Sequence, residues 1–216
     1  MDYATARRKM VESQIRPDDV TDEAVINAFS TVPREAFLPK SKQPLAYSEM
    51  EVPTVEGRAF WCARDLAKLL QAMELDSGDL VLVVGAGEGY SAALLNNIVD
   101  TVIALEATEE MTEATTDRLA GLGADRVACV TGDLQLGYAA EGPYDAILIN
   151  GRVEQVPPAL LEQLKPGGRL GTVIGTDFNA RAVVYTASEH SVASRSIFEC
   201  VPPKLSEFDV EPAFQF

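Results

Sequence analysis

The chain has 216 residues, of which 47% are hydrophobic and 24% charged, which is the composition and length of one globular domain. Its acidic residues outnumber the basic ones by 33 to 18, so the formal net charge is −15. Because a protein that binds DNA or RNA needs Lys and Arg to replace condensed counterions, this charge argues against a nucleic-acid substrate. We also expect no signal peptide, no membrane span and no metal site, since long apolar runs are absent and three cysteines with one histidine form no metal-binding pattern. The expected location is the cytoplasm.

The N-terminal part of the chain is expected to form helices and loops rather than sheet. Residues 1–14 carry a helical pattern, a second short helix is expected from residue 22, and four prolines between residues 32 and 58 predict irregular structure. The segment ARDLAKLLQAM (63–73) then places its large apolar residues on one face of a helix. We expect one compact domain with three parts, namely an N-terminal cap at 1–62, a core at 63–201 and a tail at 202–216.

From residue 80 onward, apolar runs typical of buried strands alternate with helical patterns. Strands are expected at 80–84, 101–106, 126–130, 144–150, 168–174, 180–188 and 194–201, with helices at 90–98, 109–122 and 157–164. Such alternation predicts an α/β fold in which helices cover both faces of a parallel sheet. The expected architecture is therefore Rossmann-like, with a doubly wound, mostly parallel seven-stranded sheet and additional N-terminal helices.

A glycine-rich loop, VLVVGAGEGY (81–90), joins the first of these strands to a helix. Glycines at the carboxyl end of a parallel strand permit a tight turn and let a ligand approach the backbone closely. A dinucleotide fingerprint has the spacing G-x-G-x-x-G, whereas here Tyr90 stands at the last position and no cation is near to face a phosphate. The spacing G-x-G-x-G-Y resembles the first motif of class I methyltransferases. It therefore favours S-adenosylmethionine, which carries an amino acid instead of phosphates, over NAD.

Further candidate residues for binding the cofactor follow the later strands. Glu106 can accept hydrogen bonds from both ribose hydroxyls, or it is a solvated acid at a strand end. Asp133 can accept the adenine amino group beside Leu134, or it forms an ordinary Asx turn. Asn150 can orient the methyl acceptor, or it caps a turn. The expected cofactor-binding residues are Gly85, Ala86, Gly87, Glu88, Gly89, Tyr90, Glu106, Ala107, Gly132, Asp133, Leu134 and Asn150.

The order of these motifs is similar to that of the protein-L-isoaspartate O-methyltransferase family over most of the chain. The stretches that carry the likeness are PREAFLP (33–39), AYSEMEVP (46–53), VVGAGEGYSAALL (83–95), GDLQLGY (132–138), PYDAILIN (143–150) and VPPALLEQLKPGGRL (156–170). The resemblance implies a class I methyltransferase core with N-terminal helices and a sheet whose last strand is antiparallel. It also implies methyl transfer from S-adenosylmethionine to the carboxylate of an isoaspartyl residue.

The segment before the core helix departs from the pattern of this family, which usually has G-Q-T-I-S-Q-P there, with a hydroxyl near the transferred methyl. Here the segment is GRAFWCA (57–63), and Val83 replaces an acid often found two residues before the first glycine. Trp61 stands at the place of the hydroxyl and either walls an acceptor pocket or packs under the N-terminal helices. Arg58 and Arg152 either hold a carboxylate acceptor, because a guanidinium binds it bidentately, or pair with the acidic surplus. The expected catalytic residues are Trp61, Asn150, Arg58 and Arg152.

Methyl transfer to a carboxylate needs no general base, which suits a chain whose single histidine, His190, is expected at the surface. We therefore expect an S-adenosylmethionine-dependent O-methyltransferase that acts on a protein or peptide carboxylate, either of isoaspartyl type or with a different protein or small-molecule acceptor. The alternative is a catalytically silent S-adenosylmethionine-binding module with a regulatory role, which the missing hydroxyls and Val83 favour. An NAD-dependent oxidoreductase is disfavoured by Tyr90. The sequence indicates no oligomeric state.

Overall fold

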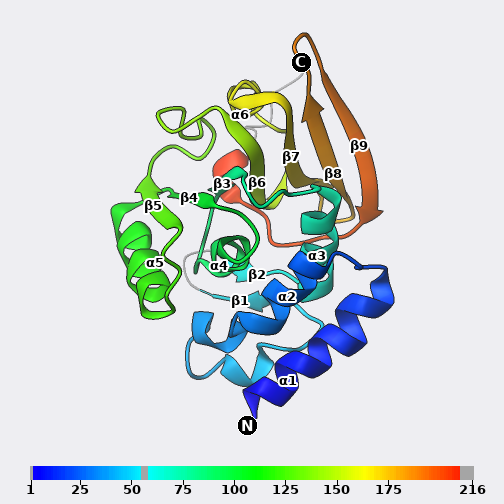
Figure 1. Ribbon diagram of the computed structural model, residues 1–216, viewed down its shortest axis with the longest axis vertical. Coiled ribbons are helices and arrows are strands. Elements are labelled where there is room, and N and C mark those ends of the chain that lie inside the picture. The colour runs from blue at the N-terminus through cyan, green and yellow to red at the C-terminus, as the bar shows by residue number, and fades with distance from the viewer. Residues whose placement is uncertain (1, 55–57, 210–216) are drawn as a thin grey trace, which may run out of the picture.

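A seven-stranded sheet runs through the molecule in the order β5-β4-β3-β6-β7-β8-β9 (Figure 1). The computed structural model describes residues 2–54 and 58–209. The strands are β3 (Leu80–Val84), β4 (Thr101–Glu106), β5 (Val127–Thr131), β6 (Tyr144–Val153), β7 (Leu164–Thr176), β8 (Asn179–Ala187) and β9 (Val192–Glu199). The five strands from β5 to β7 pair in parallel, β8 is antiparallel to β7, and β9 is antiparallel to β8. The predicted doubly wound α/β sheet is therefore confirmed.

One expectation about the sheet is wrong. The antiparallel strand is not the last one but the sixth, β8, while β9 again runs in the direction of β7. The reason lies in the connections, because short turns join β7 to β8 and β8 to β9, and a short turn can only join antiparallel neighbours. The end of the chain is thus a meander added to the parallel sheet.

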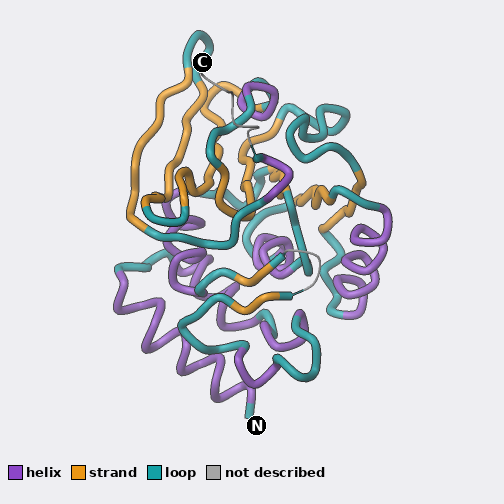
Figure 2. Tube along the Cα trace, turned by 180° about the vertical axis from the view of Figure 1, so that it is seen from behind, coloured by secondary structure: helices purple, strands orange, loops and turns teal. Residues whose placement is uncertain are grey.

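The helices are α1 (Tyr3–Met10), which continues as a π-helical turn (Val11–Ile15), α2 (Glu23–Thr31), α3 (Ala63–Ala72), α4 (Tyr90–Asn96), α5 (Glu109–Gly121) and α6 (Pro158–Leu161). Between α2 and α3 lie two short 3-10 turns and a two-stranded pair, β1 (Val52–Pro53) with β2 (Ala59–Phe60). Seen from behind, the N-terminal helices gather at one end of the molecule and the long strands at the other (Figure 2).

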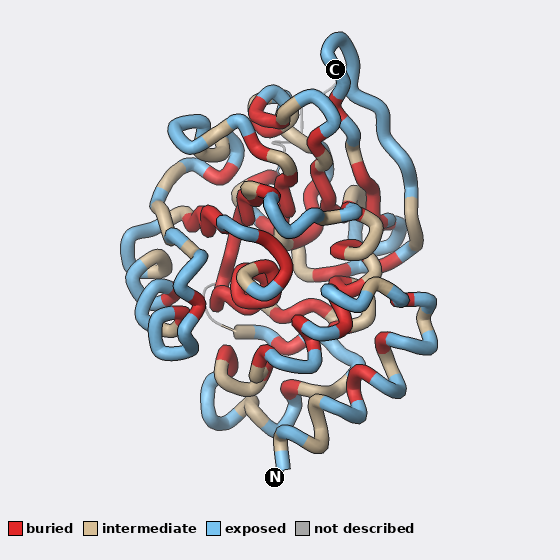
Figure 3. The backbone as a smooth tube through the Cα atoms, in the orientation of Figure 1, coloured by how far each residue is buried: buried red, intermediate tan, exposed pale blue. Residues whose placement is uncertain are grey.

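The strands alternate their side chains between two apolar clusters, as the two-residue period of a strand requires. One face packs against the N-terminal helices, α3 and α4, with Val81, Val83, Val102, Ala104, Ala146 and Leu148. The other face packs against α6 and the C-terminal tail, with Leu82, Val84, Ile103, Leu105, Ile147 and Ile149. Buried residues accordingly fill the centre of the molecule (Figure 3). Phe208 of the tail is buried in the second cluster, whereas Phe214 and Phe216 lie outside the described residues.

The expected helix at 157–164 is much shorter than predicted. It ends after one turn, at Leu161, because the chain then pairs with β6: the Tyr144 N–H donates to the Gln163 carbonyl at 2.8 Å and Leu164 lies opposite Tyr144. Strand β7 consequently begins four residues earlier than expected. None of the described helices is both long and apolar enough to cross a bilayer.

Candidate active site

The glycine loop connects β3 to α4 at the carboxyl edge of the sheet. Gly89 has a φ of +88°, and a Cβ there would stand 2.9 Å from the Thr115 side chain on α5, so only glycine fits this turn. The amide of Asn150, at the matching edge of β6, donates to the Gly85 carbonyl at 2.9 Å. The loop and Asn150, which were predicted separately, therefore lie together.

Glu106 ends β4 beside this loop, and its side chain is 1% exposed. One carboxylate oxygen accepts hydrogen bonds from the Gly87 N–H and from Arg58 Nε. The other accepts from the Ala107 N–H and from Arg58 Nη2, both at 3.0 Å. Since a carboxylate offers about four lone-pair sites, all acceptor sites of Glu106 are in use. A ribose hydroxyl can reach this carboxylate only if Arg58 moves.

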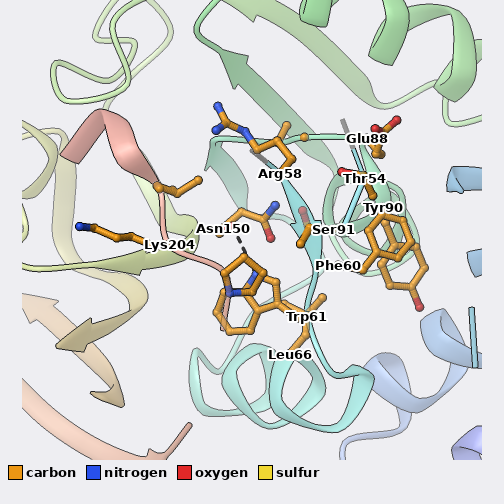
Figure 4. A pocket seen from close by; sticks show the side chains of 15 residues that line it. Thr54, Arg58, Phe60, Trp61, Leu66, Glu88, Tyr90, Ser91, Asn150 and Lys204 are labelled. Carbon is orange, nitrogen blue, oxygen red and sulfur yellow. Dashed lines mark hydrogen bonds between the residues drawn. The ribbon is translucent and has the colours of Figure 1, made fainter. Parts of the chain in front are cut away.

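Arg58 joins Glu106 to the C-terminal tail. Its Nη2 lies 3.0 Å from Glu106 and 2.7 Å from Glu207, and the arginine is buried. Burial alone lowers the pKa of Arg58, but the hydrogen bonds with the two carboxylates outweigh it and raise the pKa above its usual value. In Figure 4 the guanidinium points away from Asn150 and Trp61. Arg58 was predicted to bind the carboxylate of an acceptor, whereas here it binds carboxylates of its own chain.

We expect acid to detach the tail from Arg58. Burial raises the pKa of the Glu207 carboxyl, but the hydrogen bonds from Arg58 outweigh burial and leave this pKa below 4.5. Because this pKa is lower in the folded state, the ion pair stabilises the tail fully above about pH 4.5. This stabilisation is lost as the pH falls through the folded-state pKa. Because Glu207 is partly exposed, the effect is about 1 kcal/mol.

Hydrogen exchange of the backbone amides at 204–209 measures this detachment. The protection seen at pH 7 should fall about fivefold once the pH is below the folded-state pKa of Glu207, and Glu207→Gln should show the lower protection already at pH 7. Glu154→Gln, which removes an exposed partner of Lys204, is the matched control and should leave the protection of Leu205 nearly unchanged. Equal protection in wild type and Glu207→Gln at pH 7 would show that the ion pair does not hold the tail.

A narrow cavity of about 20 Å³ lies next to the loop, between the β1–β2 segment, α4 and the tail (Figure 4). Trp61 lines it, is 2% exposed, and donates from Nε1 to the Asn150 carbonyl at 3.3 Å. The structure thus brings three of the four predicted catalytic residues, Arg58, Trp61 and Asn150, to the lining of one cavity. The Trp61 ring is also part of the main apolar cluster, so both roles foreseen for it, cavity wall and packing under the N-terminal helices, are compatible.

Arg34, which the sequence did not single out, fixes this aromatic wall. It is 1% exposed, and its guanidinium donates to the carbonyl of Ala46 at 2.7 Å and to that of Trp61. The guanidinium carbon lies 4.8 Å from the ring centres of both Phe60 and Tyr90. Arg34 thereby connects the N-terminal cap to the cavity through hydrogen bonds and cation–π contacts.

Arg152 does not belong to the cavity. It is buried on β6, and its guanidinium bonds to Asp177 and to the carbonyls of Gly175 and Pro202. These groups lie at the β7–β8 turn and the start of the tail, so Arg152 pairs within the chain here, the second of the two uses expected for it, and its role toward an acceptor stays a prediction. Strand β6 runs on past Asn150 to Val153 with a break in its pairing to β7, and the residues after Asn150 are therefore strand rather than loop.

The side chains of other predicted cofactor residues also have partners within the protein. Glu88, within the glycine loop, pairs with Arg118 of α5 at 2.7 Å. Tyr90 is stacked on Phe60 with ring centres 5.3 Å apart. Asp133 is exposed and accepts from the Gln135 N–H at 2.8 Å, the Asx turn that was the alternative reading.

The remaining predicted cofactor residues stand at strand ends beside the loop. Ala107 and Gly132 follow β4 and β5, and the Gly132 N–H donates to the Glu106 carbonyl at 3.0 Å. Leu134 is buried near Gly85. Ala86 and Gly87 line the cavity.

Three residues of the C-terminal tail, Pro203, Lys204 and Leu205, form part of the cavity wall. The Leu205 N–H donates to the Arg152 carbonyl at 3.0 Å, and the Arg152 N–H donates to the Pro203 carbonyl at 2.8 Å. A Cβ on Gly151 would lie 2.6 Å from Leu205 Cγ, so glycine is needed where the tail crosses β6. Figure 1 shows the short tail helix (Ser206–Phe208) beside β3 and β6.

The parallel sheet, the glycine loop at the end of β3 and the acid at the end of β4 together define a class I methyltransferase. A family model described as protein-L-isoaspartate(D-aspartate) O-methyltransferase matches residues 5–201. The chain belongs to this family.

Relatives and solved structures agree with this assignment. The chain is 38% identical over 169 residues to protein-L-isoaspartate O-methyltransferase 2 of Pelobacter propionicus, covering 78% of this chain and 75% of the relative. A solved protein-L-isoaspartate O-methyltransferase has a TM-score of 0.81 at 24% identity, covering 94% of this chain and 67% of the other. A beta-aspartate methyltransferase from Plasmodium falciparum, in complex with S-adenosyl-L-homocysteine, has a TM-score of 0.74 at 17% identity, with 94% and 99% covered.

The predicted family, fold, cofactor and class of enzyme, an S-adenosylmethionine-dependent methyltransferase, are thus confirmed. The residues present also fit the cofactor. Gly85 and Gly87 have positive φ and expose backbone, and a buried carboxylate, Glu106, stands at the next strand end. The contact of Arg58 with Glu106 opposes binding, because it occupies the carboxylate. The roles of individual residues stay predictions.

Proposed function

We propose that this chain transfers a methyl group from S-adenosylmethionine to the carboxylate of an isoaspartyl residue in a protein or peptide. The family match over residues 5–201 carries the proposal, and the preserved cradle of glycine loop and Glu106 supports it. A protein substrate agrees with what the relatives are named for. The cytoplasmic location, and the expectation that nucleic acid, membrane and metal are not partners, stay predictions from the sequence.

When bound, the cofactor supplies a methyl group already activated by its positive sulfur. The acceptor carboxylate is an anion at neutral pH, so none of the residues around the cavity has to remove a proton. The chain's task is to position the two reactants and to exclude water. Asn150 holds the Gly85 carbonyl and thereby fixes the loop against β6. The rings of Phe60 and Trp61 make the adjoining wall apolar, which strips water from a carboxylate and leaves it more reactive.

The test is to incubate the purified protein with radiolabelled S-adenosylmethionine and an isoaspartyl peptide, beside the same peptide with normal aspartate. We expect base-labile label on the isoaspartyl peptide alone. Label on neither peptide, with label appearing on other components of a cell extract, would contradict the isoaspartyl acceptor but keep methyl transfer.

One observation favours a second function, a silent S-adenosylmethionine-binding module. Glu106 has all its acceptor sites filled by the chain itself, and the loop at 59–62 lacks the hydroxyl that the family usually has. Cofactor binding without label on either peptide or in the extract would establish this function instead.

A further inference from the structure

Three hydroxyl groups around the cavity are buried without a hydrogen-bond partner among the described residues. They are Oγ1 of Thr54, Oη of Tyr90 and Oγ of Ser91, and all three residues line the cavity. Figure 4 shows the Ser91 side chain beside Asn150, inside the cavity, whereas the Tyr90 hydroxyl points away from it. Ser91 is 2% exposed, so its hydroxyl has neither solvent nor, within residues 2–54 and 58–209, a partner.

The lack of a partner for Ser91 has a local cause. A serine inside a helix usually bonds back to the carbonyl four residues earlier, as Ser30 does in α2 with the Ile26 carbonyl at 2.8 Å. Ser91 is in the first turn of α4, so the residue four positions earlier is Gly87, which lies before the helix in the glycine loop with a φ of +60°. The Gly87 carbonyl accepts from the Thr115 hydroxyl at 2.7 Å and not from Ser91. Leaving a buried hydroxyl unpaired lowers stability, so a group that retains this cost is a candidate for binding a ligand.

The other polar side chains around the cavity each donate to at least one acceptor in the protein. Arg58 pairs with Glu106 and Glu207, and Lys204 pairs with Asp209 at 2.7 Å and with Glu154. The Asn150 amide donates to the Gly85 carbonyl. Among the described lining residues, the hydroxyls of Thr54, Ser91 and Tyr90 have no acceptor, and that of Tyr90 points away from the cavity.

We propose that Ser91, with Thr54, binds a carboxylate in this cavity by donating hydrogen bonds to it; this rests on the proposed methyl transfer. Hydrogen bonds to an anion are stronger than those between neutral groups, so two hydroxyls are sufficient to orient it. Unlike a guanidinium, they hold the carboxylate without cancelling its charge, and the oxygen that attacks the methyl stays nucleophilic. Ser91 lies on α4 and Thr54 directly follows β1. Their side chains thus supply the hydroxyl groups that the segment 59–62 lacks. The carboxylate is either that of the acceptor or that of the cofactor's methionine part.

Ser91→Ala tests this with two binding measurements that need no turnover. Calorimetry gives the Kd of S-adenosylhomocysteine for the protein and the Kd of an isoaspartyl peptide for that complex. If the acceptor is the ligand, the peptide Kd rises about 10- to 100-fold while the S-adenosylhomocysteine Kd stays the same. If the methionine carboxylate is the ligand, the S-adenosylhomocysteine Kd rises by that factor. Thr54→Val should raise the Kd of the same ligand.

Thermal unfolding separates this role from a structural one. Since Ser91→Ala removes an unpaired buried hydroxyl, the Tm should stay the same or rise, and weaker binding cannot then be a folding defect. Ser30→Ala is the matched control, because it removes a paired helix hydroxyl away from the cavity; it should change neither Kd. Unchanged values of both Kd in Ser91→Ala, or a wild type that binds neither ligand, would overturn the proposal. Intact binding with no methyl transfer by wild type would instead contradict the proposed function alone.

Discussion

Arg34→Ala is expected to lower the free energy of unfolding by about 4 kcal/mol, a large share of the stability of an ordinary domain. The substitution leaves the carbonyls of Ala46 and Trp61 without their buried donor, at about 1–3 kcal/mol each. It also removes the cation beside the stacked rings of Phe60 and Tyr90 and opens a cavity in place of the Arg34 side chain. Release of the buried charge offsets part of this loss.

Denaturant unfolding measures this effect, and two variants assign its cause. Arg34→Met fills most of the volume but cannot donate, so it should recover only the packing part of the loss. Arg195→Ala removes an arginine whose side chain is 62% exposed and should change stability by less than about 1 kcal/mol. If Arg34→Ala lowered the free energy of unfolding as little as Arg195→Ala, the Arg34 guanidinium would not be what holds the aromatic wall.

The main elements of the fold follow from short-range patterns in the sequence. Wholly apolar runs such as LVLVV at 80–84 can only be strands covered on both faces, and the structure has strands at these places. The boundaries that failed depend on partners distant in the chain. Leu164 leaves the expected helix because Tyr144 lies opposite it, and nothing near Leu164 in the sequence indicates this pairing.

The residues of the candidate site also fall into those that short-range patterns place and those whose partners lie far away in the chain. Gly85, Glu106 and Asn150 could be placed together because the carboxyl ends of parallel strands meet at one edge of a sheet. The partners of the charged residues could not be foreseen. Arg34 bonds to backbone carbonyls that carry no signal in the sequence, and Arg58 meets Glu207 across 149 residues.

Ser91 shows a third kind of limit. A serine in the first turn of a helix is ordinary in sequence, and only the structure shows that its hydroxyl is buried without a partner among the described residues, unlike that of Ser30. A short-range pattern contains the serine but not the burial of its hydroxyl beside the cavity.

Glu106→Ala is expected to weaken the binding of S-adenosylmethionine about 100-fold. The substitution removes the carboxylate that is placed to accept the two ribose hydroxyls, and hydrogen bonds to a charged group contribute about 1.5–3 kcal/mol. Calorimetric titration with the cofactor measures the change. Asp177→Ala, which removes an acid that pairs with Arg152 away from the cavity, should leave the affinity unchanged.

Arg58→Met should have the opposite effect and tighten binding about tenfold, because the free protein holds Glu106 in a form that cannot accept ribose. The apparent affinity is the affinity of the binding-competent form multiplied by the fraction of molecules in that form. Breaking the buried contact of Arg58 with Glu106 is the step that makes the site competent. In the double variant, Arg58→Met should have no further effect, since the carboxylate that it frees is gone. If Arg58→Met instead weakens binding as much as Glu106→Ala does, Arg58 contacts the cofactor directly, and the ion pair is part of the binding site rather than a competitor for it.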